Sequence, residues 1–424
     1  MALAMGAVLA VLALLAACGG GSEAPRDTAS LRLLNASTGY AGLDLAADNA
    51  TVNSAVAFGA VGAYASVGTA GVALVVSHSG AVGALASTIR TLAKNEHVTL
   101  VAYGAPGALK TVFIPDDLAV PANGLTSVQV QNLAPDAGTL DVYLTGANDA
   151  LASATPLAPA LAAGSGQAAS NVIAGSYRLR VTGSGDKADL RLDVPDLVLG
   201  ARQVGTLVLS QGAGGVLVNA VWLVQQGKSA ALANPQARLR VVSALAAGAR
   251  VSLGVAGTAV ASASVAPAIT PYTAVPASDA ALVQLTVNNA PVALAAQVLA
   301  AGGDYTVLVW GDAGAPSTTW ISDDNRYPTA LTGAKLRLIN ATSGAPVALT
   351  LKADFSVVVT ELAPGRASAF APVPATSGAR LDVSSAGNAA LASLAGVNLV
   401  AKGVYSLVML GDSAAPVADL RKDR

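Results

Sequence analysis

Hydrophobic and polar positions alternate along the chain in short runs that end in turn residues. In the segment 335–344, Leu336 and Leu338 alternate with Arg337, which is the two-residue period of a strand with one buried face. Asn, Thr, Ser and Gly follow in the same segment and favour a turn. This stretch therefore predicts a short strand that runs into a turn.

The same phrase occurs at three other places, in the segments 31–37, 128–134 and 239–244. The aligned residues, spaced 97, 111 and 97 positions apart, are Asn35, Asn132, Ser243 and Asn340. A second landmark follows each opening after 68 to 80 residues, a strand that ends at Gly104, Gly212, Gly311 or Gly411. Two landmarks at a nearly fixed separation indicate one unit that is repeated four times.

Each unit has about a hundred residues, with many short alternating runs and regular turn signals. In the run 177–181, for example, Tyr177, Leu179 and Val181 are expected to face inward. The uncharged stretch 204–224 is split by a glycine-rich segment at 212–215, which favours a hairpin over a membrane helix. The pattern predicts an all-β chain of four tandem immunoglobulin-like β-sandwich domains, with boundaries 31–118, 126–227, 238–325 and 335–424.

The first residues are of a different kind. Positions 2–17 are almost wholly apolar, and this run has the length of a signal-peptide core but is short for a membrane span. It ends in Leu15-Ala16-Ala17-Cys18, and a Gly- and Ser-rich stretch follows that would form a flexible tether.

This segment resembles a bacterial lipoprotein signal. The resemblance implies that 1–17 is removed, that Cys18 becomes the lipidated first residue, and that 18–30 is a tether. Gly19 after the cysteine implies the outer membrane, with the domains facing the periplasm or the outside. Such signals normally open with Lys or Arg, which positions 1–5 lack, so either the true start lies upstream or the signal is atypical.

The charge of the chain narrows the classes of function. Charged residues make up 12% of the sequence, the net charge is −1, and Lys and Arg are scattered without a basic block. A nucleic-acid binder needs a concentrated basic face, so we expect no nucleic-acid partner. With one cysteine in the sequence, no disulfide within the chain is possible.

Several strand motifs together resemble a known family. They are the opening phrase, Asp141-Val142-Tyr143-Leu144, the strand 175–181 and the ending Tyr305 to Gly311. The resemblance is to the bacterial domain-of-unknown-function family 4397, which occurs mostly in secreted proteins and lipoproteins, and it covers about 30–419. It implies a fold and a location but no activity. The first unit departs from the pattern, since it has Leu43-Asp44-Leu45 without an aromatic residue.

One segment suggests catalysis. The segment 411–416 resembles the nucleophile segment of chymotrypsin-like serine proteases, with Ser413 as the nucleophile. The third unit has Ala313 at the same place, and both histidines, His78 and His97, lie in the first unit. A base must lie within hydrogen-bond reach of its nucleophile, so we expect a turn here and no catalytic residue.

Acidic pairs at domain exits suggest a second kind of site. Asp116-Asp117 and Asp323-Asp324 each follow a terminal strand, where they would either bind Ca²⁺ or form solvated acidic linkers. A calcium site needs six to eight oxygens, and the sequence shows two or three at each junction, so we favour the linker. Two isolated histidines do not make a zinc site, and we expect no metal or cofactor.

Aromatic residues gather near the ends of the units. Trp222, Trp310, Trp320 and Phe113 would either form a platform for sugar stacking or plug the core edge and the domain junctions. We favour the second interpretation.

These observations predict a non-catalytic, lipid-anchored cell-envelope protein that acts as a structural or adhesive module. Its expected partners are the membrane, through the anchor, and envelope proteins or polysaccharide. The alternatives are a polysaccharide- or peptidoglycan-binding lipoprotein and a serine hydrolase that uses Ser413.

Overall fold

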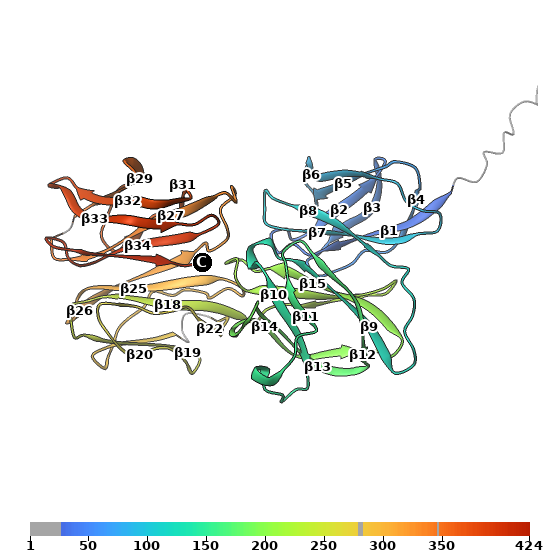
Figure 1. Cartoon of the computed structure of the whole chain (residues 1–424), viewed down its shortest axis with the longest axis horizontal. Coiled ribbons are helices and arrows are strands. Elements are labelled where there is room, and N and C mark those ends of the chain that lie inside the picture. The colour runs from blue at the N-terminus through green and yellow to red at the C-terminus, as the bar shows by residue number, and fades with distance from the viewer. Residues whose placement is uncertain (1–26, 279–282, 346) are drawn as a thin grey trace, which may run out of the picture.

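The computed structural model describes residues 27–278, 283–345 and 347–424. Eight sheets pair into four β-sandwiches, so the predicted all-β fold class is confirmed (Figure 1). The only helical elements in the described ranges are two short 3-10 turns, η1 (Pro135–Ala137) and η2 (Leu151–Ser153). Cys18 and most of the expected tether lie outside the described residues.

Domain 1 (28–115) and domain 2 (125–232) form the first pair of sandwiches. In domain 1, one sheet has the strand order β4 (Ala65–Gly68), β1 (Thr28–Asn35), β7 (His97–Tyr103), β8 (Lys110–Pro115). The other sheet has the order β3 (Ala50–Val56), β2 (Leu43–Ala47), β5 (Val72–His78), β6 (Ala84–Arg90). In domain 2, one sheet has the strand order β12 (Gly166–Ile173), β9 (Leu125–Leu133), β15 (Gln203–Gln211), β16 (Val218–Val224), β17 (Ser229–Leu232). The other sheet has the order β11 (Ala158–Leu161), β10 (Leu140–Thr145), β13 (Gly175–Gly183), β14 (Asp186–Leu199).

Domain 3 (236–323) and domain 4 (333–422) form the second pair. In domain 3, one sheet has the strand order β21 (Ala268–Ile269), β18 (Gln236–Ala244), β25 (Asp304–Asp312), β26 (Ala315–Asp323), and β22 (Thr273–Pro276) also pairs with β18. The other sheet has the order β20 (Thr258–Val265), β19 (Arg250–Val255), β23 (Val283–Val287), β24 (Ala290–Pro291). In domain 4, one sheet has the strand order β30 (Arg366–Ala367), β27 (Gly333–Ser343), β34 (Val404–Asp412), β35 (Val417–Lys422), and β31 (Ala371–Pro374) also pairs with β27. The other sheet has the order β29 (Ser356–Leu362), β28 (Leu349–Ala353), β32 (Thr376–Ser385), β33 (Asn388–Leu399).

The two sequence landmarks lie side by side in every domain. The opening strand pairs in parallel with the near-terminal strand, as β1 with β7, β9 with β15, β18 with β25 and β27 with β34. These strands form the middle of one sheet. The recurrence of both landmarks along the chain therefore reflects one pairing that is made four times.

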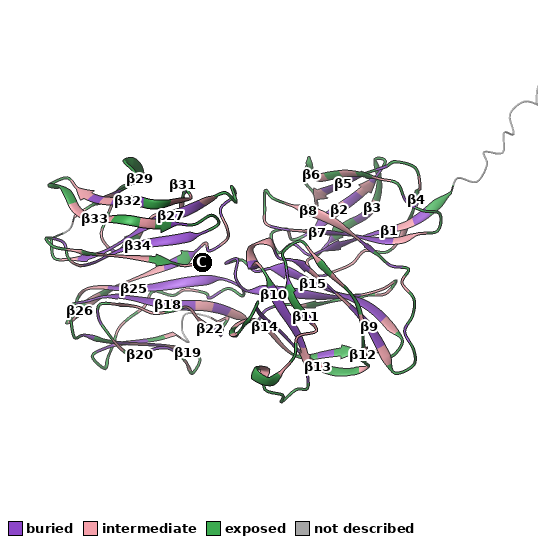
Figure 2. Ribbon diagram, in the orientation of Figure 1, coloured by how far each residue is buried: buried purple, intermediate pink, exposed green. Residues whose placement is uncertain are grey.

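This central sheet is buried on both faces, because its outer face packs against the neighbouring domain (Figure 2). In the seam between domains 1 and 2, Leu34 and Val101 pack against Val208 and Val221. An equivalent apolar cluster fills the seam between domains 3 and 4; it includes Val242, Leu308, Ile339 and Val408. The predicted hairpin at 204–224 is confirmed as β15 and β16, and it supplies one side of the first seam.

The two pairs meet at the glycine-rich turn between β15 and β16. Gly214 donates its backbone N–H to the carbonyl of Gly302 over 2.7 Å. A Cβ atom at Gly215 would lie 2.7 Å from Cγ of Arg326, so a larger residue would push the pairs apart. The C-terminal Arg424 donates from Nη1 to the carbonyl of Gly215 over 2.8 Å, which adds a second link between the halves.

Candidate functional site

A buried arginine occupies the same register position on the opening strand of three domains. Its Nε donates to a hydroxyl on the paired strand: Arg32 to Thr99 over 2.8 Å, Arg240 to Thr306 over 2.9 Å, and Arg337 to Ser406 over 2.8 Å. Domain 2 has Gln129 at this position, opposite Thr206. These side chains point out of their own sandwich and toward the neighbouring domain.

In the seam between domains 3 and 4 the ion pairs cross between the domains. Arg240 Nη1 lies 2.6 Å from Asp423 Oδ1, and Arg337 Nη2 lies 2.6 Å from Asp323 Oδ1. Tyr272 donates its hydroxyl to Asp323 over 2.8 Å, and burial raises the pKa of Tyr272 well above its ordinary value. All four charged side chains are buried, so each charge depends on a partner in the other domain.

The seam between domains 1 and 2 has one buried arginine–aspartate pair in place of two, and that pair lies within domain 1. Arg32 pairs with Asp116 of its own domain over 3.2 Å and reaches across the seam to the carbonyl of Gly227 over 2.6 Å. Gln225 directly follows the strand β16, as Asp423 follows β35 in domain 4. Its side-chain amide accepts from the N–H of Leu118 and donates to the carbonyl of Leu118, each over 2.9 Å. Backbone carbonyls therefore replace a carboxylate as the acceptors for arginine.

The prediction of solvated acidic linkers is wrong for the first aspartate of each pair. Asp116 is 2% exposed and Asp323 is 5% exposed, and arginine and hydroxyl donors occupy their carboxylates. The second aspartates are more exposed: Asp117 contacts His97 Nδ1 over 3.0 Å, and Asp324 pairs with Arg326 over 2.8 Å. In the described ranges, no three His, Cys, Asp or Glu side chains are grouped as metal ligands would be.

The structure does not bring together the residues of the hydrolase hypothesis. Ser413 is buried in the turn after β34, where its backbone N–H donates to the carbonyl of Ser343 over 2.9 Å. His78 ends β5 and lies against the ring of Tyr40, and His97 begins β7. Ser413 and the histidines therefore belong to sandwiches at opposite ends of the chain.

The prediction that the aromatic residues plug core edges and junctions is confirmed. Trp222 is buried in the core of domain 2, and Trp320 packs on the core of domain 3 and donates Nε1 to the carbonyl of Ala295 over 2.9 Å. Trp310 lies in the seam between domains 3 and 4, and Phe113 packs on the core of domain 1.

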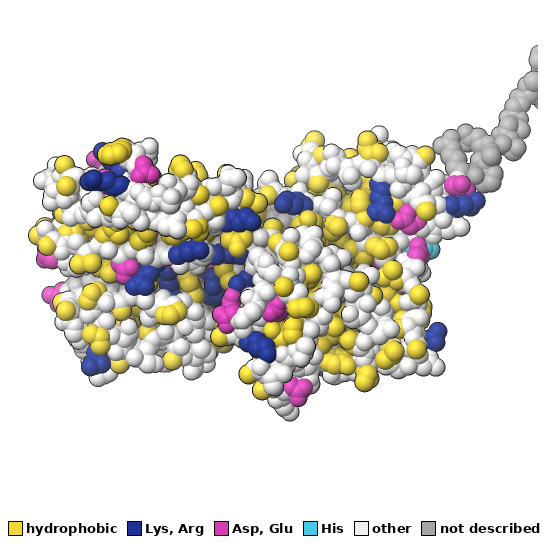
Figure 3. Space-filling model, in the orientation of Figure 1, with side chains coloured by type: hydrophobic (Ala, Val, Ile, Leu, Met, Phe, Trp, Pro, Cys, Tyr) yellow, Lys and Arg dark blue, Asp and Glu magenta, His cyan; other side chains and the backbone are white. Residues whose placement is uncertain are grey.

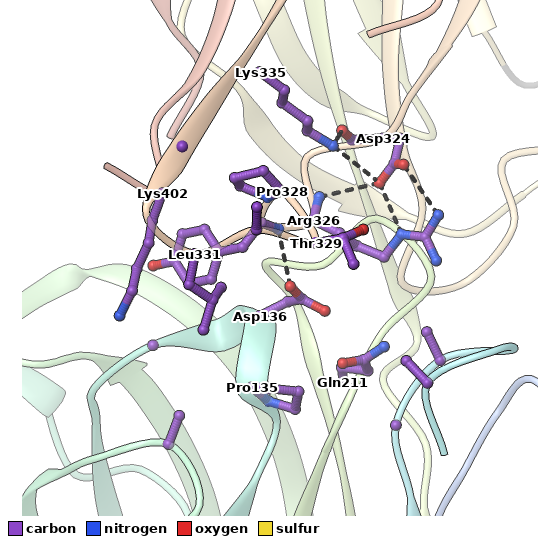
Figure 4. Close-up of a pocket in the computed structure, with 18 of the residues that line it drawn as sticks. Pro135, Asp136, Gln211, Asp324, Arg326, Pro328, Thr329, Leu331, Lys335 and Lys402 are labelled. Atoms are coloured by element: carbon purple, nitrogen blue, oxygen red, sulfur yellow. Dashed lines mark hydrogen bonds and ion pairs between the residues drawn. The ribbon is translucent and has the colours of Figure 1, made fainter. Parts of the chain in front are cut away.

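A groove of about 1470 Å³ lies where domains 1, 2 and 4 and the linker 324–332 meet. Its wall from domain 1 is the stretch from Tyr103 to Lys110, and η1 and Gln211 contribute from domain 2. The linker and Lys335, Phe370 and Lys402 form the remaining side (Figure 4). Because three domains contribute to it, no single repeat of the sequence could have revealed this groove.

The acidic groups of the groove are held by the protein itself. Asp324 accepts hydrogen bonds from Arg326, and Asp136 accepts from the backbone N–H of Tyr327 over 2.8 Å (Figure 4). Burial opposes ionisation of Asp324, but the bonds to Arg326 and the nearby Lys335 outweigh it and lower its pKa. Burial also lowers the pKa of Lys335, against the pull of Asp324.

The exposed lysines of the groove are not paired in this way. Lys110 and Lys402 line the groove and make no ion pair with the part of the chain that the structure describes. A smaller pocket of about 350 Å³ lies along the seam between domains 3 and 4, lined by Arg238, Arg240, Arg421 and Lys422 together with Asp423. Cations that are scattered in the sequence thus gather along this seam and at the central junction (Figure 3).

Among the described residues, no helix is both long and apolar enough to cross a membrane. No curated protein matches the chain.

Two solved structures resemble this chain with low sequence identity and a low TM-score. A candidate cell adhesion protein from Bacteroides uniformis ATCC 8492 has 14% identity and a TM-score of 0.22, over 48% of this chain and 99% of that one. The Bacillus anthracis TIE protein has 9% identity and a TM-score of 0.15, over 91% of this chain and 67% of that one.

A family model described as a domain of unknown function, DUF4397, matches residues 29–143 and 237–348. Each match spans the first sandwich of a pair and continues into the second, and the two together cover slightly more than half of the chain. The repeat, the strand motifs and this match agree, and the chain is a member of the DUF4397 family.

Proposed function

We propose that this protein is a non-catalytic, lipid-anchored envelope protein that acts as a structural or adhesive binding module. The observation that carries the proposal is the way the domains pack. Buried seams join the sandwiches in pairs, further contacts join the pairs, and a groove shared by three domains lies at the centre. A surface that is already fixed before binding loses little conformational entropy when a partner docks.

The anchor is the second part of the proposal. Cys18 would carry the acyl chains and the following Gly- and Ser-rich tether would hold the sandwiches away from the membrane. Each buried methylene of an acyl chain contributes about 0.8 kcal/mol, so more than one chain would make the attachment lasting. Outer-membrane location follows from Gly19, by the resemblance described above.

The non-catalytic part rests on the disposition of the candidate groups. Ser413 is buried in a turn, while His78 and His97 belong to another domain. A serine hydrolase would instead require reaction of Ser413 with a fluorophosphonate probe, and loss of that reaction in Ser413→Ala. We expect no labelling of the wild-type chain.

In-cell cross-linking of the full-length protein, followed by mass spectrometry, tests the module. We expect cross-links between the groove and one dominant envelope component, and we expect Cys18→Ser to release the protein from the membrane fraction. Cross-links spread evenly over many unrelated proteins, at the level of an unrelated lipoprotein, would contradict a binding role. Unchanged membrane attachment of Cys18→Ser would contradict the anchor.

A further inference from the structure

We propose that the central groove and the seam pocket together bind an acidic polysaccharide, a polymer that carries uronic-acid carboxylates. This inference rests on the proposed function as a binding module and names its ligand class. We call the two sites together the basic band, defined by Lys110, Arg326, Lys335, Lys402, Arg238, Arg240, Arg421 and Lys422.

The charge balance of the band favours an anionic ligand. Its carboxylates are already bound by protein donors: Asp324 by Arg326, Asp136 by a backbone N–H, and Asp423 by Arg240. Lys110, Lys402 and Lys422 are exposed and have no ion pair within the described ranges. The band therefore presents positive charge that the protein does not neutralise, on a chain whose net charge is −1.

The size and lining of the groove favour a polymer of sugars. Its volume of about 1470 Å³ is larger than the roughly 300–1,000 Å³ of usual small-molecule sites. Tyr103, Phe370 and Pro372 contribute apolar surface next to the lysines. Flat apolar groups favour the faces of sugar rings, and the ammonium groups favour the carboxylates between them. A groove of this volume, shared by three domains, suits a segment of a polymer.

The low density of free positive charge in the band favours a glycan over nucleic acid. Duplex DNA carries one charge per about 1.7 Å, and its binders typically neutralise about 6–10 phosphates. Three exposed lysines without an ion pair in the described ranges are too few for this, whereas a polymer with about one carboxylate per sugar residue has fewer charges to neutralise.

The test measures binding of polygalacturonate to the purified full-length protein in detergent. Binding of neutral dextran and of duplex DNA is measured separately for comparison. The variant carries Lys110→Gln, Lys402→Gln and Lys422→Gln together. The control carries Lys228→Gln, Arg250→Gln and Lys352→Gln, three exposed cations that line neither site.

We expect polygalacturonate to bind, the affinity to fall with added salt, and the band variant to bind about tenfold or more weakly. The control variant should bind as the wild type does. Equal binding by the band variant, equal binding of dextran, or tighter binding of DNA than of polygalacturonate at the same salt concentration would each overturn the proposal.

The failure of this inference is distinguishable from failure of the proposed function. If cross-linking in cells captures one envelope protein at the groove while polygalacturonate does not bind, the module remains and the acidic glycan is wrong. If polygalacturonate binds but Cys18→Ser stays in the membrane fraction, the ligand class remains and the anchor is wrong.

Discussion

At the scale of single residues, the asparagine of the opening phrase ties its strand to neighbouring loops. Asn340 is fully buried, and its Nδ2 donates to the carbonyls of Val347 over 2.9 Å and Leu362 over 2.8 Å. Asn35 and Asn132 make the same kind of bonds in domains 1 and 2. Domain 3 has Ser243 at this position, and its buried hydroxyl has no partner in the described residues.

We expect Asn340→Ala to destabilise domain 4 by about 1–3 kcal/mol, because two partly buried carbonyls lose the amide that donates to them. Ser243→Ala is the matched control and should change stability by less than about 1 kcal/mol, since it removes no hydrogen bond. Hydrogen–deuterium exchange of peptides from domains 3 and 4 measures both effects. Equal losses in the two variants would contradict the assigned role of the amide.

A titration belongs to the same scale. Asp141 in β10 accepts backbone N–H bonds from Ala160 over 2.7 Å and Gly185 over 2.9 Å. Burial raises the pKa of this carboxyl, but these hydrogen bonds outweigh burial and the pKa is lowered. The stabilisation is therefore present above the unfolded pKa of about 3.9 and is lost as the pH falls through the lower folded value.

Asp141→Asn removes this acid-dependent contribution. We expect the variant to be less stable than the wild type at pH 7, with a difference that shrinks as the pH falls below about 4. Urea unfolding followed across pH 7 to pH 2 measures the difference. A gap that stays constant or widens in acid would show that ionisation of Asp141 does not stabilise domain 2.

At the scale of elements, each domain contains the same bulge next to its second strand. A non-glycine residue there has a positive φ: Ala55 at 51°, Ala160 at 47°, Ala263 at 47° and Glu361 at 47°. A side-chain oxygen from the second strand accepts the N–H of each one, from Asp44, Asp141, Ser252 and Thr350 respectively. The bulge is thus a shared part of the unit, with the acceptor varied from domain to domain.

We expect Ala263→Gly to stabilise domain 3 by about 0.5–1 kcal/mol, because glycine adopts a positive φ without the steric cost that alanine incurs. Ala259→Gly, in the same strand β20 but without a positive φ, should destabilise it by a similar amount. Thermal unfolding compares the two. A loss of stability in both variants would show that the left-handed conformation at position 263 is not strained.

At the scale of the whole molecule, the seams decide the arrangement of the domains. Domains 3 and 4 exchange two buried ion pairs, while domains 1 and 2 rely on one internal ion pair, Gln225 and backbone carbonyls. A buried charge without its partner is strongly destabilising, so the crossed pairs fix how domain 4 sits on domain 3.

We expect Arg337→Met to loosen this seam by about 3–5 kcal/mol, because it leaves Asp323 buried without a cation. The control is Arg380→Met, which removes a half-exposed pair with Asp382 in the same domain and should cost about 0.5 kcal/mol or less. Hydrogen exchange in β18, β25, β27 and β34 reports the seam. Recovery of protection in 1 M salt, or equal effects of both variants, would contradict a buried ion pair.

Local patterns in the sequence were sufficient to predict the fold of the units. Two-residue periodicity, turn residues and the repeat are local signals, so they were enough for four all-β sandwiches and for placing tryptophans in cores and junctions. The comparison of Ser413 with Ala313 in the third unit predicts that Ser413 has no catalytic role, and this stays a prediction.

How the units combine could not be predicted from these patterns, because it depends on contacts between residues far apart in the chain. The link between Arg240 and Asp423 joins residues 183 positions apart, and nothing in a local pattern pairs them. For the same reason Asp116 and Asp323 looked like solvated linkers, although each lies in a buried seam. Scattered cations form the basic band because domain packing brings distant lysines and arginines to the central groove and the seam pocket. This packing depends on sheet faces that no periodicity assigns to a partner.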